Sequence, residues 1–184
     1  PNYVTAHHWF ADHLISLGRF DEAMEAITRA QSLDPLSSLI DSAAAGYYFY
    51  AKRYDEALAQ ARQALELDPD FAPSHRQLGG ILEQQGKYDE AIAAFEKACE
   101  LSGGATYSLT GRAHAYALGG RREDSLRMLR EVGEIAKRKY VSPYGIAAIH
   151  VALGDPDRAF EWLDRAVDQR DRALIWIKVA PRFD

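Results

Sequence analysis

Two polar side chains near the start of the chain have a spacing that suits metal binding. His8 and Asp12 are four residues apart, so a helix would place both on one face. A zinc site needs about three or four protein ligands, and no third ligand is evident nearby in the sequence. We therefore expect no metal at this pair.

Other residue types that could carry out catalysis are also isolated. Cys99 is the single cysteine, which excludes a disulfide framework and a cysteine metal cluster. No basic side chain that would activate Cys99 is obvious, so we expect a buried, structural thiol. The sequence shows neither a phosphate-binding loop nor a nucleophile with its base. We therefore predict a non-enzymatic protein without a cofactor.

These residues sit within a pattern that recurs every 34 residues. Small residues recur at this step in three columns, and an acidic pair opens the second segment of most units. A fixed period of this length is the signature of a repeat architecture, in which small residues mark close approaches between helices. The columns are Ala11, Ala45, Gly79, Ala113 and Ala147; Ala23, Ala57, Ala91, Ser125 and Ala159; and Ala30, Ala64, Ala98, Val132 and Ala166.

The third unit carries the clearest motif. It reads His75-x2-Leu78-Gly79-x2-Leu82, followed by Ala91-x3-Phe95. This spacing resembles the tetratricopeptide repeat (TPR), a helix–turn–helix unit of 34 residues. The resemblance covers residues 4–173, although the fourth and fifth units depart from it, with Pro156 in place of the aromatic residue at the turn.

The resemblance implies an all-α fold, a right-handed α-solenoid of five helix pairs. We expect residues 1–184 to form one domain that belongs to a longer protein, with residues 174–184 forming part of a cap over the open core face of the last repeat. The five units are predicted at residues 4–37, 38–71, 72–105, 106–139 and 140–173.

Local signals set two boundaries near the end of the array. The second helix of the fourth unit has no breaker before Ser142-Pro143, so we predict that it runs to about Tyr140. Ser142 should then cap the next helix, with Pro143 in its first turn, and Asp155-Pro156 should do the same for the last helix.

The segment after the last repeat resembles the corresponding piece of bacterial multidomain signalling and transcriptional regulators. That resemblance implies a signalling role. The default compartment is the cytoplasm, and the resemblance gives the periplasmic part of a membrane-bound regulator as the alternative. No apolar run approaches the roughly 20 residues that span a bilayer, so we expect no membrane segment.

The resemblance also implies that the first helices line a concave groove, which would bind a protein or peptide. Aromatic anchors carry much of the energy of such interfaces. The alternative is that these side chains pack against one another or beneath a neighbouring domain. The predicted groove residues are Thr5, His8, Trp9, Asp12, Phe49, Tyr50, Arg76, Gln77, Glu83, Tyr107, His114 and Tyr144.

The groove does not match the one that binds chaperone tails in this family. There a Lys, two Asn, a Lys and an Arg hold a carboxylate. The corresponding residues of this chain share none of these types, so a chaperone-tail clamp is not expected. They are His8, Asp12, Ala43, Pro73 and Gln77.

Charge is unevenly distributed along the chain. Residues 1–101 hold 8 Lys and Arg against 16 Asp and Glu, and residues 102–184 hold 14 against 11, for a net charge of −5. This balance argues against nucleic acid as a partner, although the basic fourth unit, which includes Arg127 and Arg130, leaves an anion contact as one alternative. Self-association through the oppositely charged ends or the incomplete cap is another.

Overall fold

The computed structural model describes residues 2–183, so the ends of the predicted domain, Pro1 and Asp184, lie outside the described residues. The described chain is all-helical, and the predicted solenoid of five helix pairs is confirmed. The pairs are α1 (Val4–Ser16) and α2 (Phe20–Leu33), α3 (Ser38–Tyr50) and α4 (Tyr54–Leu67), α5 (Ala72–Gln84) and α6 (Tyr88–Leu101), α7 (Thr106–Leu118) and α8 (Arg122–Ala136), and α9 (Pro143–Ala152) and α10 (Pro156–Asp168).

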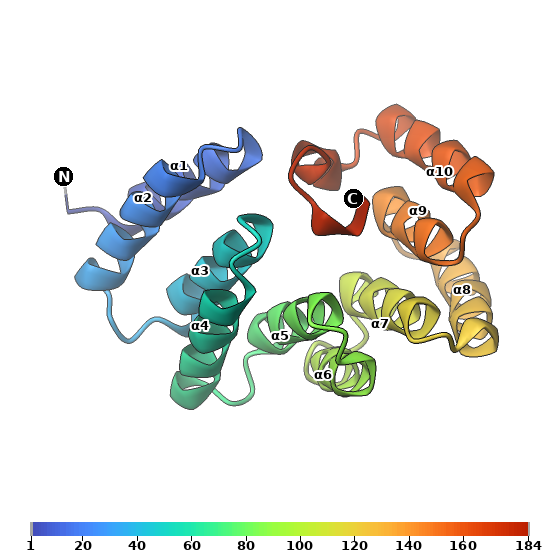
Figure 1. Ribbon diagram of the computed structural model, residues 1–184, viewed down its shortest axis with the longest axis horizontal. Coiled ribbons are helices and arrows are strands. Elements are labelled where there is room, and N and C mark those ends of the chain that lie inside the picture. Colours follow the sequence, from blue (N-terminus) through green and yellow to red (C-terminus); the bar gives the residue numbers. More distant parts are fainter. Residues whose placement is uncertain (1, 184) are drawn as a thin grey trace.

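The helix pairs follow one another around an open ring (Figure 1). The first helices of the first four pairs begin 34 residues apart, at Val4, Ser38, Ala72 and Thr106. Each pair packs mainly against its neighbours in sequence, which is the arrangement expected of a solenoid. The odd-numbered helices consequently share the inner, concave side of the ring.

The turn between the two helices of each pair repeats the same backbone conformation. Gly18, Gly86, Gly120 and Gly154 have positive φ, between 73° and 77°. The second pair has Lys52 at this position, with φ 60°. A left-handed residue after a helix lets the following amides bond back to its last carbonyls, as Arg19 N does with Leu14 O at 2.9 Å. This repeated geometry fixes the angle between the helices of each pair.

The core between the two helical layers depends on small residues. Phe95 is 1% exposed, and its ring lies beneath two glycines of the inner helices. A Cβ added at Gly79 would come within 2.9 Å of this ring, and one at Gly111 within 2.5 Å. The absence of side chains at both positions therefore lets α5 and α7 approach α6 closely.

The helix caps near the end of the array are as predicted, but one helix is shorter. Ser142 accepts a hydrogen bond from Gly145 N, and Asp155 accepts one from Arg158 N. The prediction that the second helix of the fourth unit reaches Tyr140 is wrong, because α8 ends at Ala136. The chain turns there so that Val141 can enter the core beside Val132 and Ile146.

The segment after α10 lies on the concave side of the ring, and not over the outer face of the last repeat. It contains two short 3-10 helices, η1 (Arg172–Trp176) and η2 (Pro181–Phe183). We call residues 172–183 the tail. The tail lies in the opening between α1 and α9 (Figure 1), and Val179 belongs to the buried cluster formed by α1, α2 and α3.

The outer face of α10 accordingly remains uncovered in the described part of the chain. Phe160 is 66% exposed and Val167 is 63% exposed. The tail contacts α9 of the last repeat as well as the first repeat, and it leaves this face of α10 exposed. No helix within residues 2–183 is both long enough and apolar enough to cross a membrane.

Candidate binding groove

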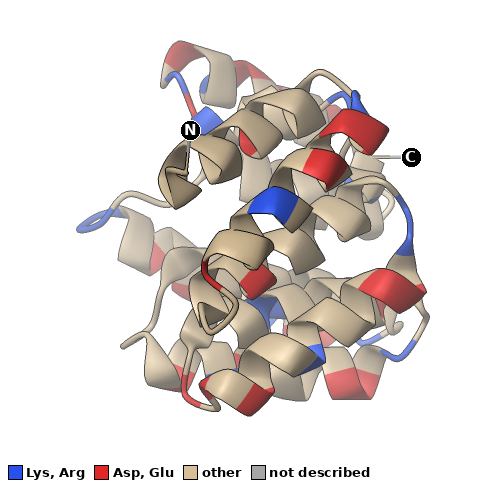
Figure 2. Ribbon diagram, turned by 90° about the vertical axis from the view of Figure 1, so that its left-hand side faces the viewer, with Lys and Arg blue, Asp and Glu red and all other residues tan. Residues whose placement is uncertain are grey.

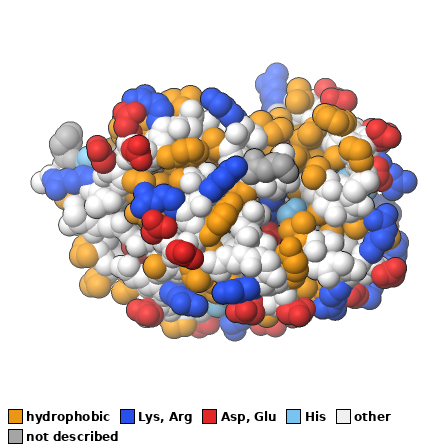
Figure 3. Space-filling model, in the orientation of Figure 1, with side chains coloured by type: hydrophobic (Ala, Val, Ile, Leu, Met, Phe, Trp, Pro, Cys, Tyr) orange, Lys and Arg blue, Asp and Glu red, His pale blue; other side chains and the backbone are white. Residues whose placement is uncertain are grey.

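A cavity of about 550 Å³ lies on the concave side of the ring. Residues from all five inner helices line it, and the tail lines the remaining side. Apolar side chains interspersed with Lys and Arg cross this part of the molecule (Figure 3). A concave surface of this size with a few polar groups is the usual form of a binding site.

Most of the groove residues predicted from the sequence meet at this cavity. Helix α1 contributes two of them, α3 two, α5 two, α7 one and α9 one. The repeat thus brings together side chains that are up to 136 positions apart in the chain, from 8 to 144. The lining residues from the predicted set are His8, Asp12, Phe49, Tyr50, Arg76, Gln77, Tyr107 and Tyr144.

The other four predicted residues lie elsewhere. Thr5 and Trp9 are outside the cavity, and Trp9 is 68% exposed on α1. Glu83 and His114 are buried at 2% each beneath the concave surface. Those two therefore belong to the structure of the groove floor, whereas Trp9 faces away from it.

A buried polar cluster forms the floor of the groove. The Glu83 carboxylate is fully buried, and its two oxygens have separate partners. Oε1 lies 2.9 Å from His114 Nδ1, and Oε2 accepts a hydrogen bond from an Arg182 guanidinium nitrogen at 2.7 Å. Burial alone would raise the pKa of Glu83, but the Arg182 charge and His114 outweigh it and hold the pKa below its usual range.

Aromatic contacts join the tail to the inner helices. The indole of Trp176 stacks on the Tyr50 ring, with centroids 4.9 Å apart and planes 9° apart. The Phe183 ring lies 5.0 Å from the Tyr144 ring. Burial raises the pKa of the Tyr50 phenol, consistent with a ring enclosed by the tail and the groove wall.

The start of the tail is held by Asp171. One carboxylate oxygen accepts hydrogen bonds from Ser142 Oγ and from Tyr144 N, and the other accepts from Ala173 N. Asp171 is 4% exposed. Because it satisfies donors at the beginning of α9 as well as in the tail, it fixes the direction in which the tail leaves the last repeat.

Arg76 supplies positive charge to the cavity wall. It lies on α5 and lines the cavity together with Tyr50 and Tyr107. Burial, aided by the nearby Arg182 charge, lowers the pKa of the Arg76 guanidinium, while the Tyr50 phenol opposes that effect. With Asp12 also lining the cavity, the groove offers both signs of charge beside aromatic surfaces.

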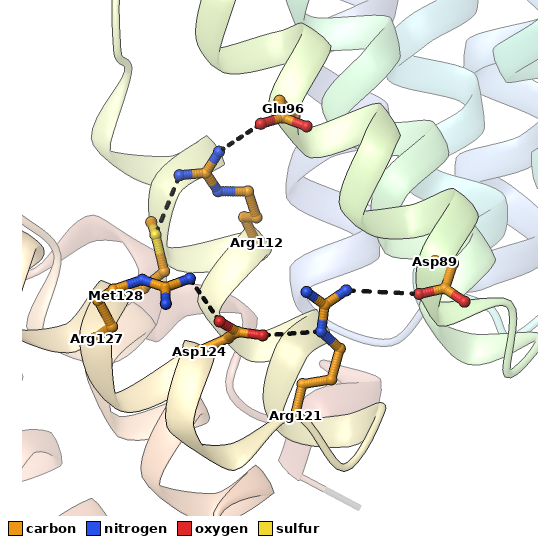
Figure 4. Close-up of polar contacts among 7 residues, drawn as sticks. All are labelled: Asp89, Glu96, Arg112, Arg121, Asp124, Arg127 and Met128. Atoms are coloured by element: carbon orange, nitrogen blue, oxygen red, sulfur yellow. Dashed lines mark hydrogen bonds and ion pairs between the residues drawn. The ribbon is translucent and has the colours of Figure 1, made fainter.

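Several basic residues of the fourth repeat are paired with carboxylates. Arg121 bonds to Asp124 at 2.9 Å and lies 3.7 Å from Asp89, and Arg127 also bonds to Asp124. Figure 4 shows this group, in which the basic side chains lie between α6, α7 and α8. These pairs offset part of the positive charge of the fourth repeat. The first repeats, which face the viewer in Figure 2, carry interspersed acidic and basic positions.

The metal-binding and thiol candidates have structural surroundings. Asp12 accepts a hydrogen bond from the Tyr47 hydroxyl at 3.2 Å, and burial lowers the pKa of His8. Within residues 2–183, no group of three or more His, Cys, Asp or Glu side chains could hold a metal ion. Cys99 is half-buried, and burial raises the pKa of its thiol.

Sequence reasoning missed the residues of the tail that enter the groove. It places Trp176, Val179 and Arg182 in a cap over the last repeat. One signal bears on them, since Glu83 falls in a groove column and would need a cationic partner if it were buried there. A carboxylate in that position requires a positive partner when buried, and the tail carries three basic residues, Arg172, Lys178 and Arg182.

Solved structures confirm the type of fold. TTC0263, a TPR protein of Thermus thermophilus, matches with a TM-score of 0.74 at 16% identity, covering 98% of each chain. A structure of MamA matches with a TM-score of 0.62 at 22% identity, covering 76% of this chain and 83% of that chain. YrrB, described as a TPR protein with an unusual peptide-binding site, matches with a TM-score of 0.57 at 20% identity, covering 96% and 91%. At these identities the likeness concerns the fold alone.

Comparison with sequence families gives the same result along most of the chain. No curated protein matches the sequence significantly. Three models described as tetratricopeptide repeat match residues 4–35, 42–106 and 106–131, which together make up more than half of the chain. TPR folds serve generally as non-catalytic scaffolds for protein–protein interaction. The chain therefore belongs to the tetratricopeptide-repeat family.

Proposed function

We propose that the concave groove binds a peptide segment of a partner protein or of a neighbouring domain. The observation that carries this proposal is the cavity of about 550 Å³, which eight of the predicted groove residues line. Tyr50, Tyr107 and Tyr144 provide large apolar surfaces with polar edges, and side chains of this kind dominate peptide and protein interfaces. Arg76 and Asp12 add charges that orient a peptide.

A random library of 12-residue peptides, displayed on phage, tests the groove directly. The full chain and its Trp176→Ala form serve as baits, since Trp176 covers Tyr50. We expect convergent peptides whose affinity, measured by fluorescence anisotropy, falls at least tenfold with Arg76→Ala or Tyr107→Ala. Arg62→Ala is the matched control, because Arg62 is exposed on α4. Convergent peptides that bind equally to all four variants, or an absence of convergence on both baits, would contradict the proposal.

Self-association is a second candidate function, favoured by the two ends of the ring. Phe160 and Val167 are exposed on α10, and Trp9 and Phe10 are exposed on α1 at 68% and 54%. Exposed apolar residues at both ends suit head-to-tail contact between copies. Val179 of the tail is not available for such a contact, because it is buried inside the ring.

Light scattering over a concentration series distinguishes this candidate. We expect a mass above that of one chain at high concentration, and Phe160→Glu should restore the mass of one chain. An unchanged one-chain mass at every concentration would end this proposal while leaving the groove proposal intact.

A further inference from the structure

Three of the tail side chains that meet the concave surface are spaced three residues apart. Trp176 stacks on Tyr50 of α3. Val179 is 9% exposed and packs into the buried cluster of the first repeat. Arg182 reaches Glu83 of α5 and lies 5.9 Å above the centre of the Phe95 ring. Each side chain therefore occupies its own position in the groove, as the anchors of a bound peptide do.

Side chains make these contacts, whereas the tail's backbone bonds locally. Ile177 N bonds to Leu174 O, Val179 N to Trp176 O, and Phe183 N to Ala180 O. No hydrogen bond recorded among residues 2–183 joins the backbone of the tail to the backbone of α1, α3, α5 or α7. The tail is thus a compact unit placed on the groove, and not an integral layer of the solenoid.

The centre of the groove sets a chemical requirement on whatever occupies it. Glu83 is fully buried, and Arg182 is the partner of one of its two carboxylate oxygens. Removing the cation would leave a buried carboxylate half-paired, which is strongly unfavourable. Arg76 also lines the cavity, but the hydrogen bond to Glu83 Oε2 comes from Arg182. A segment that replaces the tail and covers Glu83 again therefore needs a cationic donor at this position, which Arg supplies here.

We propose that the tail is a resident ligand of the groove and that partner segments displacing it carry the same pattern. That pattern is an aromatic residue, a β-branched apolar residue three positions later and an Arg three positions after that. The aromatic residue stacks on Tyr50, the apolar residue enters the first repeat, and the Arg pairs with Glu83. This inference rests on the proposed function and names the chemical class of its partner. The expected partner segment is basic and contains an aromatic residue.

A peptide with the sequence of residues 172–183, labelled with fluorescein, is the probe. The protein is the full chain, compared with the double variant Trp176→Ala and Arg182→Ala. This variant, called the emptied form, lacks the tail side chains that contact Tyr50 and Glu83. A tethered segment competes at an effective concentration of about millimolar. We therefore expect the emptied form to bind the probe at least tenfold more tightly than the unchanged chain does.

Two controls test the chemistry of the contact. A probe in which Ala replaces the Arg corresponding to Arg182 should lose at least tenfold in affinity for the emptied form. Adding Glu83→Gln to the emptied form should weaken the original probe by a similar factor. A folded emptied form that binds the probe no better than the unchanged chain, or equally well after Glu83→Gln, would overturn the inference.

A second measurement covers the case in which the emptied form does not fold. The unchanged chain is mixed with an excess of isotopically heavy peptide, and hydrogen exchange of the tail is followed by mass spectrometry. We expect faster exchange across residues 172–183, with the protection of α3, α5 and α7 retained. Unchanged exchange of the tail at saturating peptide would overturn the inference. Library peptides that depend on Arg76 and Tyr107 but leave the tail protected would preserve the proposed function while rejecting this ligand class.

Discussion

The indole of Trp176 lies flat on the Tyr50 ring, 4.9 Å between centroids, so the end of the chain stacks on the second repeat. Stacked aromatic pairs contribute about 0.5–1.5 kcal/mol beyond the burial of their area. Trp176 is half-buried. Its stack joins the tail to α3 and does not join two helices of the solenoid. The stack therefore stabilises the docked tail more than it stabilises the helix pairs.

Replacing Trp176 with Ala should release the tail. We expect the free energy of tail docking to fall by about 2 kcal/mol, from the lost stack and the lost apolar burial. Trypsin should then cleave after Lys178, which is exposed, about 20 to 30 times faster, because each 1.4 kcal/mol corresponds to about tenfold in population. Trp9→Ala is the control, since Trp9 is exposed outside the cavity. Equal cleavage rates for the two variants would contradict this prediction.

The Arg182–Glu83 pair should show strong coupling in a double-mutant cycle. Arg182→Ala leaves the buried Glu83 carboxylate with His114 only, and we expect a loss of about 3 kcal/mol in the free energy of unfolding. With Glu83→Gln already present, Arg182→Ala should cost about 2 kcal/mol less. Urea unfolding followed by circular dichroism measures both.

An exposed arginine provides the comparison for that cycle. Arg158 lies 3.5 Å from Asp155, and its side chain is 65% exposed. Arg158→Ala should change the free energy of unfolding by less than about 1 kcal/mol, because solvent screens such a pair. Similar losses for Arg158→Ala and Arg182→Ala would show that burial does not distinguish the two pairs.

The lowered pKa of Glu83 should make the fold sensitive to acid. Its two neighbouring charged or titratable groups are Arg182 and His114, and both favour the carboxylate. Because the folded pKa lies below the unfolded one, the stabilisation is fully present above the ordinary pKa of a glutamate. It is lost as the pH falls through the folded value. We expect the urea concentration at the midpoint of unfolding to decrease once the pH falls below about 4.5.

Glu83→Gln should remove a large part of that acid dependence. Glu56→Gln is a matched control, since Glu56 also has a lowered pKa, caused by its hydrogen bond to Arg53, but is exposed. Urea midpoints between pH 7 and pH 3 provide the measurement. An acid slope that persists unchanged in Glu83→Gln would assign it to other carboxylates.

Two glycines should respond in opposite ways to replacement by Ala. A Cβ at Gly111 would lie 2.5 Å from the buried Phe95 ring, and we expect Gly111→Ala to destabilise the fold by about 1–3 kcal/mol. Gly133 lies on an exposed part of α8, and a Cβ added there would meet no atom within 4 Å. Gly133→Ala should stabilise the fold by about 0.5–1 kcal/mol through helix propensity. Thermal unfolding compares the two, and a stabilising Gly111→Ala would contradict the packing argument.

The repeated parts of the structure were accessible from the sequence. Small residues such as Ala11, Ala45 and Ala113 recur in register because the two helices of each repeat approach each other closely at this position. Five copies of the pattern make the repeat easy to detect. The inner-helix columns also located most of the cavity wall. Trp9 falls in such a column, but its side chain is exposed outside the cavity.

The tail was not accessible in the same way. Glu83 and Arg182 are 99 residues apart, and their contact occurs once. No period reveals a contact of that kind, and a segment with exposed Ile175 and buried Val179 could equally have packed on α10. The early end of α8 has the same origin, because the packing of Val141 depends on the next repeat and not on local helix signals.

The position of Val179 against the first repeat also has a mechanical consequence. In a solenoid whose two ends do not touch, each repeat contacts only its neighbours. Small rotations between neighbouring units therefore accumulate along the array. Here Asp171 fastens the tail to the fifth repeat and Val179 fastens it to the first. The docked tail thus links the first and fifth repeats, and we expect the curvature of the ring to vary more once the tail leaves the groove.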